Sequence, residues 1–237
     1  MLGLLVIIII SWILLYFIEK KNIDVLGIVP NKKRGLQFVI GFVFIVLITL
    51  SLVYIETMIN SIVWEQKSVD FRLICDAFVY HVRSALTEDL VFRGAILYIL
   101  IRRLGANWGI LISALCFGVY HVFSYGMTSE RIVPIVYVIL VTGFTGYVWA
   151  YAFDKTKSIL FALGLHIGSN MILTLFFPSQ NYGEILFTEL SRVHLTEWNE
   201  FYFSLFKGFY ASAMTFLFLR LILKSNFKIF KTPQETV

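Results

Sequence analysis

Three charged side chains interrupt an otherwise apolar stretch, "LTEDLVFRGAILYIL", at residues 86–100. On a helix, Asp89 and Arg93 are four residues apart and share a face, which predicts an ion pair between them. Glu88 points about 100° away from Asp89 and can face a neighbouring helix. The spacing therefore predicts that Asp89 and Arg93 support the structure, and that Glu88 is available for chemistry.

Two histidines occur in similarly apolar surroundings. In "FGVYH", Phe117 and His121 are one helical turn apart, and in "HIGSN" the same spacing aligns His166 with Asn170. A carboxylate combined with two imidazoles and an amide fits hydrolysis. Glu88 would act as general base toward water, and the other three polar groups would orient that water and stabilise an oxyanion.

Other chemistry is compatible with the same residues. Glu88, His121 and His166 could form a His2Glu zinc set, although the HExxH pattern of many zinc proteases is absent. We therefore expect no cofactor and keep zinc as the alternative. A transporter could use Glu88 as a proton site, but the chain has no convincing internal repeat. A noncatalytic membrane scaffold, or an immunity-type protein that binds a partner, is the remaining alternative.

The composition is that of a membrane protein. Of 237 residues, 59% are apolar and 15% charged, and the mean hydropathy is +0.81, which is too apolar for a soluble domain. A membrane-spanning helix needs about 20 mostly apolar residues. We predict an all-α, polytopic protein that forms one integral membrane domain over residues 1–237, with the lipid bilayer as a partner and no nucleic acid. About seven spans are expected, at residues 2–18, 36–59, 75–101, 107–124, 132–152, 158–177 and 201–223.

Charge is distributed unequally between the connections. The longest connection without a basic excess, 178–200, has four glutamates and one arginine. By the positive-inside rule we expect a cell-membrane protein with its N-terminus outside and its C-terminus in the cytoplasm. The basic residues of the other connections are Lys20, Lys21, Lys32, Lys33, Arg34, Arg102, Arg103, Lys155, Lys157, Lys224, Lys228 and Lys231.

Helical rise allows the depth of each polar group to be compared. At about 1.5 Å per residue, Glu88, His121, His166 and Asn170 fall within about two helical turns of one plane. They could therefore form one site.

Other residues are given structural roles. Gly164 and Gly168 form a small-xxx-small pattern, which predicts close packing of one face of their helix while His166 faces elsewhere. Glu56 and Lys207, near segment ends, are expected to snorkel or to face a loop.

The three motifs "EDLVFR", "FGVYH" and "HIGSN" resemble the E-E-x-x-x-R, F-x-x-x-H and H-x-x-x-N/D motifs of one family. This is the CAAX protease and bacteriocin-processing family, also called the Abi or CPBP intramembrane proteases. The resemblance covers about residues 75–177 and defines a motif-bearing core. It implies an intramembrane endopeptidase that cleaves a membrane-associated peptide or protein, and it leaves the oligomeric state open.

The resemblance also implies a role for each motif residue. Glu88 would activate water, His121 would assist it, and His166 and Asn170 would form the oxyanion site. Three further residues would support these groups, namely Asp89, Arg93 and Phe117. Asp89 departs from the pattern, because the family usually has glutamate there, and this departure keeps the noncatalytic alternative open.

Overall fold

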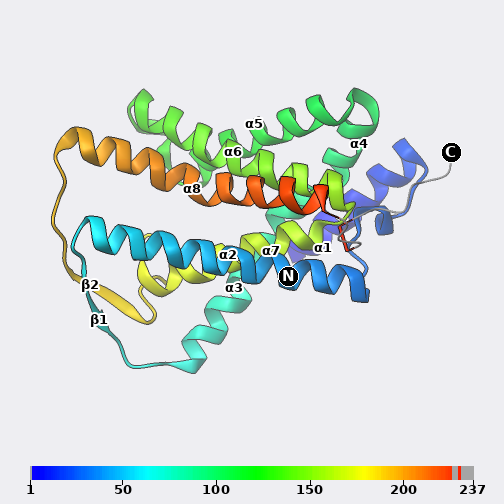
Figure 1. Cartoon of the computed structure of the whole chain (residues 1–237). Coiled ribbons are helices and arrows are strands. Elements are labelled where there is room, and N and C mark those ends of the chain that lie inside the picture. Colours follow the sequence, from blue (N-terminus) through cyan, green and yellow to red (C-terminus); the bar gives the residue numbers. More distant parts are fainter. Residues whose placement is uncertain (1, 226–228, 231–237) are drawn as a thin grey trace.

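The computed structural model describes residues 2–225 and 229–230. The fold is all-α, as predicted, and it has one small two-stranded sheet (Figure 1). Within the described residues, six helices are long and apolar enough to cross a membrane, so this is an integral, multi-pass membrane protein. The helices are α1 Leu2–Leu14, α2 Lys32–Ile59, α3 Phe71–Phe92, α4 Ala95–Leu104, α5 Ala106–Ser124, α6 Ile132–Thr156, α7 Ile159–Phe176 and α8 Glu197–Lys224.

The third expected span, 75–101, is not one continuous helix. It is divided into α3 and α4 at Arg93 and Gly94, and neither part is among the six candidate spans. Gly94 adopts φ −90° and ψ −135°, which is outside the helical region, and a Cβ there would collide with the Leu90 carbonyl. Helix α3 also begins earlier than expected, because Asp70 caps it by accepting hydrogen bonds from the Arg72 and Leu73 amides.

A short antiparallel sheet joins two segments that the sequence treats as connections. Strand β1 (Val63–Gln66) pairs with β2 (Phe187–Ser191), and Trp64 lies opposite Glu189. Beyond the sheet, the Val193 amide donates to the Asn60 carbonyl at 2.8 Å. The sheet therefore holds the chain before α8 against the end of α2 (Figure 1).

The close packing predicted from Gly164 and Gly168 is confirmed. A Cβ on Gly164 would collide with the Phe38 carbonyl, and one on Gly168 would lie 2.6 Å from Ile45 Cγ2. Helix α7 therefore packs on α2 through its glycine face, and other faces of α7 are left for the polar residues.

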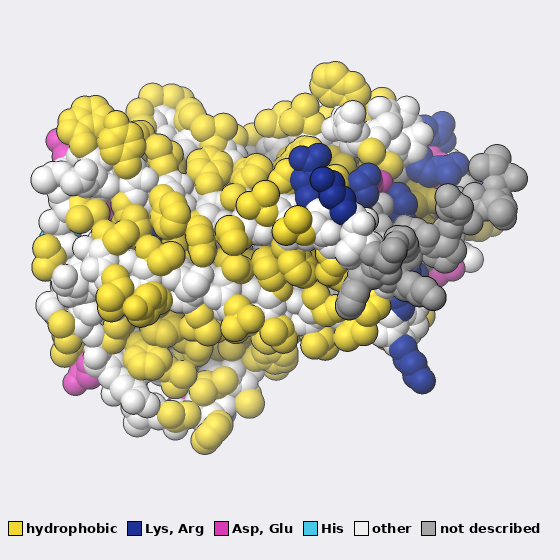
Figure 2. Space-filling model, viewed as in Figure 1, with side chains coloured by type: hydrophobic (Ala, Val, Ile, Leu, Met, Phe, Trp, Pro, Cys, Tyr) yellow, Lys and Arg dark blue, Asp and Glu magenta, His cyan; other side chains and the backbone are white. Residues whose placement is uncertain are grey.

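Charged side chains gather at the ends of the molecule, while apolar side chains cover the visible face between them. Figure 2 shows Lys and Arg side chains gathered toward the right-hand end of the molecule. Lys228 and Lys231, which belong to the same predicted basic set, lie outside the described residues.

Candidate active site

The structure brings Glu88 between the two motif histidines. Its Oε2 atom lies 4.0 Å from His121 Nε2 and 3.8 Å from His166 Nε2. Ser84, one turn earlier on α3, donates a hydrogen bond to the other carboxylate oxygen at 3.3 Å. Both separations to the imidazoles exceed a direct hydrogen bond, and they are short enough for one water molecule to bridge the groups.

Asp89 and Arg93 form the ion pair expected from their spacing. Arg93 Nη1 lies 3.3 Å from Asp89 Oδ1, and both side chains are completely buried. The guanidinium carbon is 3.8 Å from the centre of the Phe117 ring and 5.0 Å from that of Trp149, so aromatic faces also stabilise the charge. His166 Nδ1 is 3.6 Å from Asp89 Oδ1, which connects the pair to the site.

Helix α5 fixes the orientation of His121. Its Nδ1 atom is 2.8 Å from the carbonyl oxygen of Phe117, one turn earlier. Because a carbonyl oxygen can only accept, Nδ1 carries the proton and Nε2 is directed toward Glu88. The rings of Tyr120 and Tyr125 also contact His121, with centroids at 5.3 and 5.1 Å.

Helix α7 holds His166 under a tryptophan. The Trp149 ring lies at 39° to the imidazole with the centroids 4.6 Å apart. Asn170, one turn further along α7, lines the same cavity as His166. The motif residues of α7 are therefore on one face, and the glycine face packs on α2.

A cavity of about 580 Å³ extends from the two histidines between α2, α5, α6, α7 and α8. His121, His166 and Asn170 line it, and Glu88 does not. The histidines therefore connect Glu88 to the space in which a substrate could bind.

The Glu88–histidine arrangement is wider than a tetrahedral zinc site. Zinc bonds of about 2.0–2.2 Å hold ligand atoms roughly 3.3–3.6 Å apart, whereas the separations here are 3.8 and 4.0 Å. Among the described residues, no group of three or more His, Cys, Asp and Glu side chains has an arrangement that could hold a metal ion. Zinc therefore stays the alternative to a metal-independent reaction.

Comparison with known proteins agrees with the motifs. Residues 70–172 match the family model described as type II CAAX prenyl endopeptidase Rce1-like. The resemblance to the CAAX protease family is confirmed. The Rce1-like segment contains every motif residue, from Glu88 to Asn170.

One curated relative also resembles the chain. The uncharacterized protein YyaK of Bacillus subtilis (strain 168) is 30% identical over 191 residues, and the match covers 75% of this chain. The match covers 61% of that relative's length. No solved structure gives a significant match.

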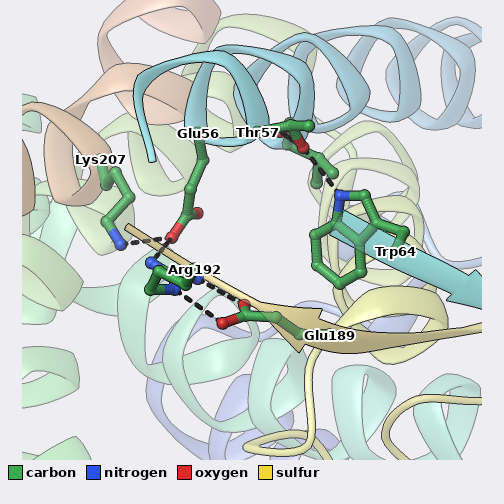
Figure 3. Close-up of polar contacts among 7 residues, drawn as sticks. Glu56, Thr57, Trp64, Glu189, Arg192 and Lys207 are labelled. Carbon is green, nitrogen blue, oxygen red and sulfur yellow. Dashed lines mark hydrogen bonds and ion pairs between the residues drawn. The ribbon is translucent and has the colours of Figure 1, made fainter. Parts of the chain in front are cut away.

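Sequence reasoning missed a second charged group in the same cavity, outside the Rce1-like segment. Glu56, at the end of α2, is predicted to snorkel or to face a loop. Its side chain is only 6% exposed, so it does not snorkel, and it faces Arg192 in the connection between β2 and α8. Its Oε1 atom accepts hydrogen bonds from Lys207 at 2.8 Å and from Arg192 at 3.0 Å (Figure 3). Arg192 also donates two hydrogen bonds to Glu189, at 2.9 and 2.8 Å. We call these four residues the outer ion network.

The outer ion network also corrects the expectation for Lys207. This lysine does not face a loop or snorkel, because Glu56 binds it at the wall of the cavity. No local sequence pattern predicts these two contacts, because Glu56 is 151 residues from Lys207 and 136 from Arg192. The acidic excess of the 178–200 connection was the one available signal.

Proposed function

We propose that this protein is an intramembrane endopeptidase that uses glutamate-activated water. The observation that carries the proposal is the position of Glu88 Oε2, 4.0 and 3.8 Å from the Nε2 atoms of His121 and His166. Water between these groups could give a proton to the carboxylate at ordinary hydrogen-bond distances. The family match supports a protease of the CAAX type in general.

The proposed reaction conserves atoms and charge. Glu88 takes a proton from water as the water oxygen bonds to the carbonyl carbon of the peptide. The carbonyl electron pair moves to its oxygen, and the Asn170 amide and the His166 imidazole donate to that oxyanion. The intermediate then breaks its C–N bond, and the proton held by Glu88 passes to the leaving nitrogen. The products are a carboxylic acid and an amine.

Asp89, Arg93 and Phe117 act in this proposal as positioning residues. Asp89 Oδ1 lies 3.6 Å from His166 Nδ1 and 3.3 Å from Arg93 Nη1, so Arg93 neutralises the carboxylate that faces His166. Phe117 contacts Arg93 with its ring and His121 with its carbonyl. Through these contacts, both histidines are joined to the buried Asp89–Arg93 ion pair.

The proposed setting is the cell membrane, with the Lys- and Arg-rich end of the molecule in the cytoplasm. Support comes from the gathering of basic side chains at one end (Figure 2) and from the positive-inside rule. The N-terminus would then lie outside and the C-terminus inside.

Cleavage is tested with purified full-length protein in lipid nanodiscs. The probe is a set of membrane-anchored peptides that carry a fluorophore and a quencher, prepared in farnesylated and unfarnesylated forms. We expect the wild type to cut at least one peptide, and Glu88→Gln to lower the rate by about 10²–10⁴-fold without lowering the unfolding temperature. Glu65→Gln, which removes an exposed glutamate of β1, is the matched control and should keep full activity.

Two results would contradict the proposal. One is full activity of Glu88→Gln, and the other is retention of a peptide by wild type and variant alike without cleavage, as expected for a noncatalytic binding protein. A strong chelator with metal analysis separates the zinc alternative, because metal-independent cleavage persists when no zinc is bound.

A further inference from the structure

The cavity is an elongated slot with chemically different ends. Along α7, the lining residues His166, Asn170 and Leu173 follow a helical period on one face, and Phe177, directly after the helix, continues the lining. Ile45, which touches Gly168, and Glu56 mark the same interval on α2. Eleven residues of helix rise by about 16 Å, so the slot could hold about four or five residues of extended peptide.

The walls between the ends combine hydroxyl groups with apolar side chains such as Leu52, Val53 and Leu173. The hydroxyls of Thr142, Thr145 and Thr215 line the slot and donate to carbonyls one turn earlier in their own helices. Ser212 completes this group through a 2.7 Å contact with Thr145. The hydroxyl oxygens retain acceptor capacity, so the slot offers hydrogen-bonding groups to a peptide backbone beside its apolar surface.

The far end of the slot has more charged donors than acceptors. Glu56 is the one carboxylate among the described residues that line the cavity, and Arg192 and Lys207 line it beside Glu56. Glu189 holds Arg192 but is not a lining residue. An ammonium has three N–H donors, of which Lys207 uses one for Glu56, and a guanidinium has five, of which Arg192 uses three.

The two cationic side chains are also more exposed than the carboxylate that binds them. The side chains of Lys207 and Arg192 are 26% and 18% exposed, whereas that of Glu56 is 6% exposed. The cavity therefore presents two cations held in fixed positions by short bonds to Glu56 and Glu189. Donors fixed in this way need little reorganisation to bind an anion.

We propose that Lys207 and Arg192 bind a carboxylate of the substrate peptide, about four residues from the bond that is cleaved. The inference rests on the proposed endopeptidase function, since the histidine end of the slot is taken as the point of cleavage. The carboxylate is either an acidic side chain or the free C-terminus of the peptide, because both offer the same oxygens. The predicted substrate is thus an extended peptide with a negative group near the mouth of the slot.

Binding is measured with the Glu88→Gln protein, which should leave the peptide uncut. Three fluorescent peptides share one sequence up to the fourth residue after a fixed bond. The first ends there with a free carboxylate, the second has an aspartate there and an amidated end, and the third has asparagine and an amidated end. We expect the first or the second to bind about tenfold more tightly than the third, and the better one identifies the source of the carboxylate.

Substitutions in the outer ion network distinguish a carboxylate-binding role from a purely structural role, because the two roles predict opposite changes in peptide binding. Lys207→Met should abolish the preference for a carboxylate, and Lys207→Arg should keep it. Glu56→Gln should increase the preference for a carboxylate, because it removes a competing negative charge. If the outer ion network only supported the structure, Glu56→Gln would instead weaken the binding of all three peptides. Lys67→Met is the matched control, since Lys67 is an exposed lysine paired with Glu184 away from the cavity lining.

The inference and the proposed function fail separately. Equal binding of the three peptides, or an unchanged preference in a folded Lys207→Met protein, overturns the carboxylate site alone. Absence of cleavage by the wild type overturns the endopeptidase function. A preference that is tenfold, sensitive to Lys207 and stronger in Glu56→Gln supports the site.

Discussion

The inner pair of Asp89 and Arg93 and the outer ion network both place charges within the helical bundle, but they hold those charges differently. The inner side chains are fully buried with 3.3 Å between the nearest charged atoms, and the outer cations are partly exposed with bonds of 2.8–3.0 Å. Neither oxygen of Asp89 makes a hydrogen bond of good geometry with a described residue, whereas Glu189 accepts two from Arg192.

This difference separates two uses of buried charge. The inner pair relies on charge neutralisation and on the rings of Phe117 and Trp149, which leaves its polar atoms incompletely bonded. Incompletely bonded polar groups are costly in a protein interior and are found mainly where function requires them. The outer network has well-formed bonds and tolerates partial hydration. We therefore expect substitutions in the inner pair to be the more damaging.

The largest effect is expected from Arg93→Met. The variant leaves Asp89 buried and unpaired, so the free energy of unfolding should fall by about 3–5 kcal/mol. Denaturant titration in mixed micelles measures this loss. The double variant Asp89→Asn/Arg93→Met removes both charges and should recover most of the loss. A cost below about 1 kcal/mol for the single variant would show that the pair is not isolated from water.

Glu56→Gln should have a smaller effect on the free energy of unfolding, about 1–3 kcal/mol. Lys207 and Arg192 lose a partner, but both cations keep access to water, and Arg192 keeps Glu189. The same denaturant titration applies, with the exposed Glu197→Gln as a control that should change stability by less than about 0.5 kcal/mol. If Glu56→Gln cost as much as Arg93→Met, the contrast between the two clusters would be wrong.

The two clusters also differ in how far the sequence could reveal them. Asp89 and Arg93 are one helical turn apart, so helix geometry alone predicts their contact. Helical rise likewise brought Glu88, His121 and His166 to a similar depth, and the structure places the Glu88 carboxylate within 4.0 Å of both imidazoles. Local periodicity is sufficient when each residue lies on a long helix.

Longer-range contacts had no such signal. The bonds from Glu56 to Arg192 and Lys207 depend on the pairing of β1 with β2 and on the packing of α8, neither of which follows from a local pattern. Hydropathy also continues across Gly94, so it predicted a continuous third span where the backbone leaves the helical conformation. The six remaining expected spans correspond to helices that are long and apolar enough to cross a membrane, because each contains a long apolar stretch with few charged side chains.

Asp89→Glu examines the departure from the family motif within the inner pair. The longer side chain keeps the charge beside Arg93 and His166, but its added methylene must fit where no surface is exposed. We expect kcat/KM for the peptide probe to fall by less than about tenfold, or about 1.4 kcal/mol. The isosteric Asp89→Asn, which removes the charge, should lower kcat/KM further. Equal losses in the two variants would indicate that size rather than charge matters at this position.

The smallest effect concerns Glu189 of the outer network and depends on pH. Hydrogen bonds from Arg192 hold the pKa of the Glu189 carboxyl below its ordinary value. A lowered folded-state pKa means that ionised Glu189 stabilises the protein above the ordinary carboxyl pKa of about 4.3, and that this contribution is lost as pH falls through the folded-state value. Thermal unfolding of wild type and Glu189→Gln should thus differ by at most about 1 kcal/mol at pH 7 and converge as pH falls below the folded-state pKa. High salt should reduce the difference at pH 7, because the pair is partly exposed. A difference that persisted unchanged into acid would mean that the negative charge of Glu189 is not what stabilises Arg192, and the outer network would then resemble the inner pair more closely than its hydrogen bonds indicate.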